Sequence, residues 1–242
     1  MKFARFVLLS CTLFALALSG CARFPDVSDG PRAKRLVITI TLAGEARLGI
    51  GTDLRDPYYY FFLIRNEGDP AGQTGPLPVI QPPWGNGYAA GRYTHMVALG
   101  PFQAQPFGQY FLYRFDDPGV QLQAVLLGTP VAFTTPAAGD RILRFEIDLA
   151  QISPTPADAS RITHLQVNII ATDYLPTNPD EPSNSKRWDA LGAGAGDINR
   201  FLNLAVTQDS TYDNSYFGNI EPRGDVADPS LDIVDFSIEV RS

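Results

Sequence analysis

Four acidic residues have the side-chain type that could bind a hard metal ion. Glu67 and Asp69 lie in one long stretch without a strand or helix pattern, and Asp173 and Asp180 lie in a second. Calcium prefers carboxylate and other oxygen ligands, so the sequence predicts calcium at one of these positions. Neither stretch has the alternating acids of an EF-hand loop, and the alternative is that these acids are solvated turn residues.

The same two stretches, residues 66–91 and 173–199, contain both tryptophans of the chain. A tryptophan or tyrosine ring offers a flat face and one polar group, which suits stacking on a sugar or anchoring a protein contact. The alternative is that these rings pack over the ends of the fold. The four candidates for ligand binding are Trp84, Tyr88, Tyr174 and Trp188.

Residues that could perform catalysis are few. The two histidines, His95 and His164, both lie in predicted strands, where a structural role is commoner than a catalytic one. The Gly-x-Ser-x-Gly, phosphate-loop and His-Glu-x-x-His patterns are absent. We therefore expect no enzyme activity. A carbohydrate-active enzyme that uses two carboxylates is the last of the alternatives.

The beginning of the chain has the pattern of a secretory signal. Lys2 and Arg5 precede a mostly apolar run, Phe6–Leu18, which is shorter than the roughly 20 residues of a membrane-spanning helix. The run ends in Leu18-Ser19-Gly20-Cys21, which resembles the lipobox of bacterial lipoproteins. This resemblance implies cleavage before Cys21 and several acyl chains on that cysteine, which anchor a protein durably. The alternative is an ordinary cleaved signal followed by a chance cysteine.

Composition limits the chemistry of the predicted mature protein. Cys11 leaves with the signal and Cys21 carries lipid, so no disulfide, thiolate metal site or cysteine nucleophile remains. The chain has a net charge of −7, and the loss of Lys2 and Arg5 makes it −9, which argues against a nucleic-acid partner. Ala22 stands where an aspartate would resemble an inner-membrane retention signal, so outer-membrane placement is favoured.

Most of the remaining chain predicts β-strands. Apolar and polar residues alternate in four stretches, which predicts half-buried strands with one solvated face: 36–42, 141–149, 163–172 and 234–240. Five further stretches are rich in aromatic or branched residues: 58–65, 92–99, 109–115, 120–126 and 200–206. The pattern predicts an all-β fold, a single antiparallel β-sandwich that is jelly-roll-like and has long loops.

The stretch Tyr58–Gly72 carries a further pattern, since aromatic residues occupy both faces of its strand. We expect one face in the core and the other covered by a loop, because monomers avoid large exposed apolar patches. The stretch resembles an aromatic strand that runs into an acidic turn in sugar-binding and DOMON-like sandwiches. In those domains the turn carries aspartates, whereas Arg65 and Asn66 occupy these places here. The resemblance implies a sandwich of the same kind.

Together these patterns predict a cleaved signal at 1–20, a lipidated tether at 21–35 and a β-sandwich domain at 36–242. We expect an envelope lipoprotein, with the lipid on Cys21 as its membrane contact. Its sandwich binds a glycan or a protein through the aromatic loops and does not catalyse a reaction. The alternative is a structural or assembly lipoprotein that recruits an envelope protein. No cofactor other than calcium is expected.

Overall fold

A computed structural model describes residues 34–50, 55–66, 74–79, 89–102, 105–116, 124–176, 186–193 and 197–242. The predicted signal, Cys21 and most of the tether lie outside these residues. The described part consists mainly of strands, with one short 3₁₀ turn, η2 (Leu149–Ile152), and one short helix, α2 (Pro156–Ala159). No helix in the described ranges is long and apolar enough to cross a membrane.

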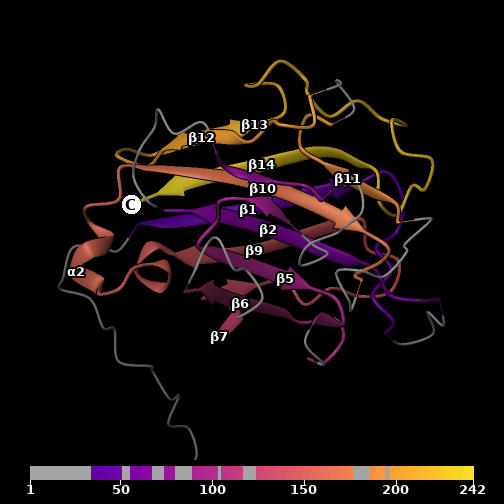
Figure 1. The fold of residues 1–242 in the computed structure, drawn as a ribbon, viewed down its shortest axis with the longest axis horizontal. Helices are drawn as coiled ribbons and strands as arrows, with labels where there is room; N and C mark the ends of the chain where they lie inside the picture. Colours follow the sequence, from indigo (N-terminus) through magenta and orange to yellow (C-terminus); the bar gives the residue numbers. More distant parts are fainter. Residues whose placement is uncertain are drawn as a thin grey trace, which may run out of the picture. The chain divides into compact units, whose positions relative to one another are not determined.

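The strands form two main antiparallel sheets (Figure 1). Sheet A has the spatial order β13-β14-β1-β9-β8. Its strands are β1 (Arg35–Leu42), β8 (Ala132–Phe133), β9 (Ile142–Asp148), β13 (Ser210–Asp213) and β14 (Ile233–Arg241). Neighbouring strands of sheet A pair antiparallel throughout. Some neighbours follow one another in the chain, as β8 and β9 do, and others are distant in it, as β1 and β14 are.

Sheet B has the order β11-β10-β2-β5-β6-β7, and β12 also pairs with β10. Its strands are β2 (Tyr59–Arg65), β5 (His95–Leu99), β6 (Tyr110–Phe115), β7 (Ala124–Gly128), β10 (His164–Thr172), β11 (Trp188–Ala190) and β12 (Leu202–Ala205). A separate pair, β3 (Pro76–Leu77) and β4 (Ala90–Gly91), forms a third small sheet. The chain passes between sheets A and B four times, at β1–β2, β7–β8, β9–β10 and β12–β13.

The inner faces of the two sheets pack against each other as a sandwich. Alternating residues of β1 and β9 point inward, so that Ile38, Ile40 and Phe145 are buried. Phe62 of sheet B meets Phe145 of sheet A edge-on, with ring centroids 5.8 Å apart. Both residues belong to one apolar cluster that draws on both sheets. These observations confirm the predicted all-β sandwich.

The outer face of sheet B is also buried. Phe61 and Leu63 of β2 lie in a second apolar cluster with Tyr93 and Met96, which confirms that the second aromatic face is covered. The prediction of a solvated face on β10 was wrong, because all its residues after His164 are buried.

Asn168 shows how polar groups on this covered face of β10 are satisfied. Its Nδ2 donates to the carbonyl oxygens of Pro76 (2.9 Å) and Arg200 (3.1 Å), and its Oδ1 accepts from Leu191 N (3.2 Å). Asn168 therefore fastens three covering segments to the strand. The sequence pattern could not predict this cover, because it comes from segments distant in the chain.

The predicted loop at 173–199 contains a strand that the sequence pattern did not indicate. Trp188–Ala190 pairs with Ile170–Thr172 as β11. The short helix α2 begins after its N-cap Thr155, whose side chain accepts a hydrogen bond from Asp158 N.

Candidate functional site

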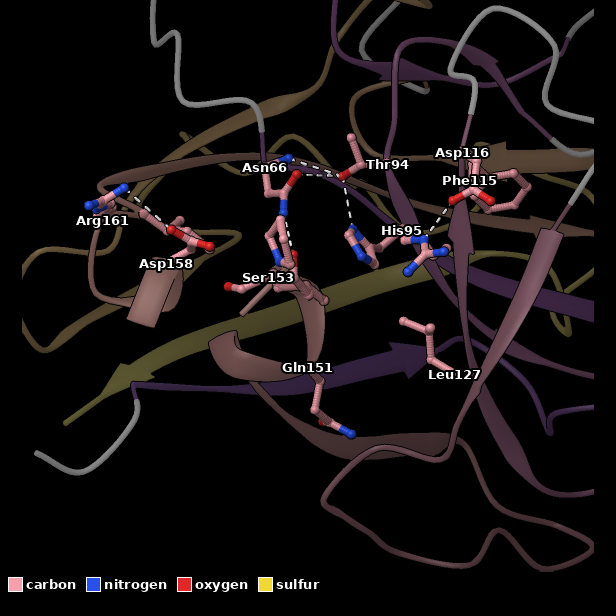
Figure 2. Close-up of a pocket in the computed structure, with 14 residues that line it drawn as sticks. Asn66, Thr94, His95, Phe115, Asp116, Leu127, Gln151, Ser153, Asp158 and Arg161 are labelled. Carbon is pink, nitrogen blue, oxygen red and sulfur yellow. Dashed lines mark hydrogen bonds and ion pairs between the residues drawn. The ribbon is translucent and has the colours of Figure 1, made fainter. Parts of the chain in front are cut away.

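A pocket lies at one end of the sandwich, where the chain crosses from β9 in sheet A to β10 in sheet B (Figure 2). Its volume is about 720 Å³, within the range of small-molecule sites. One wall comes from the ends of β2, β5, β6 and β7, and the other from η2, α2 and the residues that join them to β10. The polar lining residues are Asn66, Thr94, His95, Arg114, Asp116, Gln151, Ser153, Asp158 and Arg161.

Local sequence fixes the second wall. Asp148 ends β9 and caps η2, since its Oδ1 accepts from Ala150 N (2.8 Å). Gln151 completes the capping box by accepting from Asp148 N (3.2 Å), and its Nε2 donates to Thr129 O (2.9 Å). A reciprocal cap of this kind satisfies free backbone groups at the start of a turn. In this protein the capping box turns the chain at the end of β9, so that Gln151 to Pro154 line the pocket.

Three side chains of the first wall form a connected hydrogen-bond chain, which Figure 2 shows as dashed lines. Asn66 Nδ2 donates to Ile152 O, so its Oδ1 faces Thr94. Thr94 Oγ1 lies 2.9 Å from that Oδ1, 3.2 Å from Ile64 O and 3.0 Å from His95 Nδ1. The network therefore joins the two pocket walls through Asn66.

This chain favours one tautomer of His95. The shortest contact of the Thr94 hydroxyl is with Asn66 Oδ1, which can only accept its proton. We assign the proton to that bond, so that His95 Nδ1 donates to Thr94 Oγ1. In the neutral ring the other nitrogen, Nε2, is then an acceptor. Among the described residues Nε2 has no hydrogen-bond partner, so it is available to a ligand hydroxyl.

Burial keeps His95 neutral. Loss of hydration, and then the nearby positive charge of Arg114, lower the pKa of His95 from 6.5 to about 4. At neutral pH the ring therefore carries no charge and offers an acceptor to the pocket.

The charged groups of the described lining balance. Arg114 Nε donates to Asp116 Oδ1 at 2.7 Å, and Arg161 Nη1 lies 3.4 Å from Asp158 Oδ1. Each carboxylate thus has an arginine partner, and two positive charges face two negative ones. Apolar surface from Leu127, Ile152, Pro154 and Ile162 lies between these polar groups. The arrangement suits a neutral ligand with hydroxyl groups and some apolar surface.

Comparison with protein families, curated proteins and solved structures finds no match for this chain. The function of the pocket is therefore inferred from its residues and their geometry.

Two of the four predicted aromatic candidates lie in the described residues, and they are near each other, because Trp188 pairs with Thr172, two residues before Tyr174. Trp188 lies in β11, half-buried against the second apolar cluster, and Tyr174 is half-buried after β10. Trp84 and Tyr88 lie outside the described residues. Neither Trp188 nor Tyr174 lines the pocket, so binding through these rings stays a prediction.

The predicted calcium ligands are also dispersed or outside the described ranges. Asp173 is engaged by Arg187, whose Nε donates to Asp173 Oδ2 (2.7 Å) and whose backbone N donates to Oδ1 (2.8 Å). Arg187 in turn contacts Asp228 and the Tyr58 hydroxyl. Glu67, Asp69 and Asp180 lie outside the described residues, so calcium at these positions stays a prediction.

Part of the pocket could be predicted from the sequence. Asn66 was singled out as standing in the place of an aspartate, and it lines the pocket, whereas its neighbour Arg65 is buried and bonds to Gln166 and Thr74. Arg114 and Arg161 carried no signal. They lie far apart in the chain and meet only because the β9–β10 crossing passes the end of sheet B.

Proposed function

We propose that this chain is an envelope lipoprotein, held by lipid on Cys21, whose β-sandwich binds a short neutral glycan in the pocket at its η2 end. In a bacterium with two membranes we place it on the outer one. The sandwich presents the ligand site and the lipid provides the anchor. The protein acts by binding and not by catalysis.

The observation that carries this proposal is the composition of the pocket. It combines the Nε2 acceptor of neutral His95, guanidinium donors of Arg114 and Arg161, and a set of charges that cancels. Sugar hydroxyls donate and accept hydrogen bonds, while sugar rings carry apolar C–H faces. A neutral glycan therefore matches both the polar groups and the apolar lining.

The engaged carboxylates support a binding role. Asp116 is bonded to Arg114, and Asp158 accepts from Thr155 Oγ1 (2.7 Å) besides its contact with Arg161. Hydrolysis of a glycosidic bond uses two carboxyl groups that act on the substrate. The carboxylates of this pocket are instead held by neighbouring side chains.

The test is a glycan array probed with the detergent-solubilised full chain, followed by calorimetry of any bound glycan. Arg161→Gln should weaken binding about tenfold, because a hydrogen bond from a charged donor contributes about 1.5–3 kcal/mol. His95→Asn keeps a donor at the Nδ1 position but removes the Nε2 acceptor and should also weaken binding. His95→Gln restores an acceptor there and should lose less.

Arg141→Gln provides the matched control, since Arg141 is an exposed arginine at the start of β9 and does not line the pocket. It should bind as the wild type does. If Trp84→Ala abolishes glycan binding while Arg161→Gln and His95→Asn leave it unchanged, the ligand binds at the aromatic loops and the pocket proposal is wrong. If the protein binds no glycan on the array, the proposal of a glycan ligand is wrong.

A second candidate, recruitment of an envelope protein, is favoured by one different observation. The edge strands of both sheets, β7 and β8, follow each other in the chain and expose apolar side chains. Val125, Leu126 and Leu127 lie in β7, Phe133 lies in β8 and Val131 lies between these strands, with Leu126 45% exposed. We call them the apolar edge. Contiguous exposed apolar surface is typical of a protein contact.

A further inference from the structure

Four carboxylates gather at the end of the sandwich opposite the pocket. Asp189 lies in β11, and Glu221, Asp225 and Asp232 lie in the segment between β13 and β14. Asp189 Oδ2 accepts from Ile233 N, and Ile233 pairs with Leu42 at the end of β1. The pocket lies near Arg35 at the beginning of β1, which pairs with Asp148 before η2. A strand of this length separates the two sites by roughly 20 Å.

The carboxylates are close together and mostly buried. One oxygen each from Asp189, Glu221 and Asp225 lies within 4.8 Å of the other two. Asp189 is 0%, Glu221 3% and Asp232 2% exposed, whereas Asp225 is exposed to solvent. Ligand oxygens on one calcium ion at about 2.4 Å can be no more than about 4.8 Å apart. The three oxygens therefore have the spacing of a shared ion.

Two buried oxygens of the cluster have no partner among the described residues. Glu221 Oε2 and Asp232 Oδ1 are inaccessible to solvent and accept no hydrogen bond. A buried polar atom without a partner is costly. A bound cation would give both oxygens the positive partner that the protein itself does not supply.

The cluster has no basic side chain as a partner among the described residues. In the described part of the chain no arginine or lysine pairs with any of the four carboxylates, although nearby Asp228 contacts both Arg47 and Arg187. Burial and the neighbouring carboxylates together raise the pKa of Glu221 to about 9 and that of Asp189 to about 7. The metal-free cluster therefore takes up protons, which a bound cation would displace.

Backbone N–H groups fix the orientation of the three buried carboxyl groups. Asp189 accepts from Ala190 N (2.8 Å) and Ile233 N (2.7 Å), Glu221 Oε1 accepts from Gly192 N, and Asp232 Oδ2 accepts from Gly224 N (2.9 Å). Such bonds favour the charged form and fix the direction of the remaining lone pairs. In Glu221 and Asp232 the bonded oxygen leaves the other oxygen free.

We propose that Asp189, Glu221, Asp225 and Asp232 form a binding site for a calcium-like divalent cation. All four ligands are carboxylates, and no histidine or cysteine contributes, which excludes the nitrogen and sulfur donors that zinc prefers. Calcium accepts several carboxylates in one site, whereas magnesium keeps most of its water. The ion fastens the segment between β13 and β14 to β11, and thus sheet A to sheet B.

The test uses the detergent-solubilised full chain after removal of metal with a chelator. Titration with CaCl₂ should show one bound ion, and a hundredfold excess over Kd should raise the melting midpoint by about 5–10 °C. MgCl₂ should raise it much less. Terbium, which replaces calcium and luminesces near aromatic residues, gives an independent binding signal.

Glu221→Gln separates this proposal from a purely structural cluster. The amide keeps an oxygen for Gly192 N and is neutral without taking up a proton, so at neutral pH the metal-free variant should melt above the metal-free wild type. It should also lose the calcium-induced shift, which reverses the order of the two proteins when calcium is added. Asp225→Asn, at the exposed ligand, should weaken calcium binding at least tenfold.

Asp235→Asn is the control, because Asp235 is an exposed acid on β14 outside the cluster. It should keep the full calcium response. The proposal is overturned if the wild type binds no calcium at millimolar concentration. It is equally overturned if Glu221→Gln and Asp225→Asn respond to calcium as the wild type does.

Discussion

At the scale of single residues, the Thr94 hydroxyl decides what the pocket offers a ligand. With its proton assigned to Asn66 Oδ1, His95 Nδ1 is the donor to Thr94 and Nε2 is left as an acceptor. The sequence could place His95 in a strand but could not reveal this role. The hydroxyl, amide and imidazole come together only through the pairing of β2 with β5.

The pKa of His95 predicts a loss of stability in mild acid. Above pH 6.5 the ring is neutral in both the folded and unfolded chain. As the pH falls from about 6.5 to about 4, the unfolded chain binds a proton that the folded chain does not, so the free energy of unfolding decreases, by up to about 3 kcal/mol from this group. Urea unfolding between pH 7 and pH 4.5 measures this slope.

His95→Gln has no titrating group at this position and should flatten that slope. His164→Gln changes the half-exposed histidine of β10 and should keep the wild-type slope. Equal slopes for all three proteins would mean that His95 takes up its proton in the folded state.

At the scale of strands, alternation predicted the elements that have one covered face. Residues of β1, β9 and β14 follow the predicted alternation of buried and more exposed positions, because sheet A packs on one side only. β10 did not, because β3, which pairs with β4, packs against its second face. Strands of two or three residues leave too little periodicity in a sequence to be predicted.

The acidic cluster illustrates the same limit. Asp189 lies in a stretch considered for calcium, but its partners Glu221, Asp225 and Asp232 come from a segment that was not. The only sign of the cluster in the sequence is that acidic residues recur every three or four positions in this segment, at Glu221, Asp225, Asp228 and Asp232. Only the pairing of β11 with β10, and the approach of Ile233, bring the two segments together.

The apolar edge predicts a protein contact that a single charge should weaken. Leu126→Lys places a charge in the centre of β7, where edge charges oppose pairing with another chain. Crosslinking in the native envelope should yield fewer protein adducts with this variant, while its stability changes by about 0.5 kcal/mol or less because the site is exposed. Thr211→Lys, on the edge strand β13, is the matched control. Identical adducts from both variants would count against the apolar edge as the contact.

At the scale of the whole molecule, the pocket lies at the end where the chain enters the sandwich. Leu149 N, at the start of η2, donates to Lys34 O (2.9 Å). The chain between Cys21 and Lys34 can span at most about 45 Å. Lipid on Cys21 would therefore keep Lys34, at this end of the sandwich, within that distance of the bilayer.

The anchor itself is tested by Cys21→Ser. The wild type should fractionate with membranes, and mass spectrometry should find residue 21 at the N-terminus with added acyl chains. Cys21→Ser should lose the acyl mass and leave the membrane fraction, because no cysteine remains to carry lipid. Cys11→Ser, within the predicted signal, should behave as the wild type does. An unmodified Cys21 in the wild type would refute the lipoprotein assignment.

The position of β1 constrains when the protein can fold. β1 is the first strand in the chain, yet its neighbours are β9 and the much later β14. Residues 35–42 therefore remain without one of their partners until residues 233–241 have been made. Long-range pairing of this kind slows folding. In the proposed lipoprotein, export and acylation of Cys21 would therefore act on a chain whose sheet A is still incomplete.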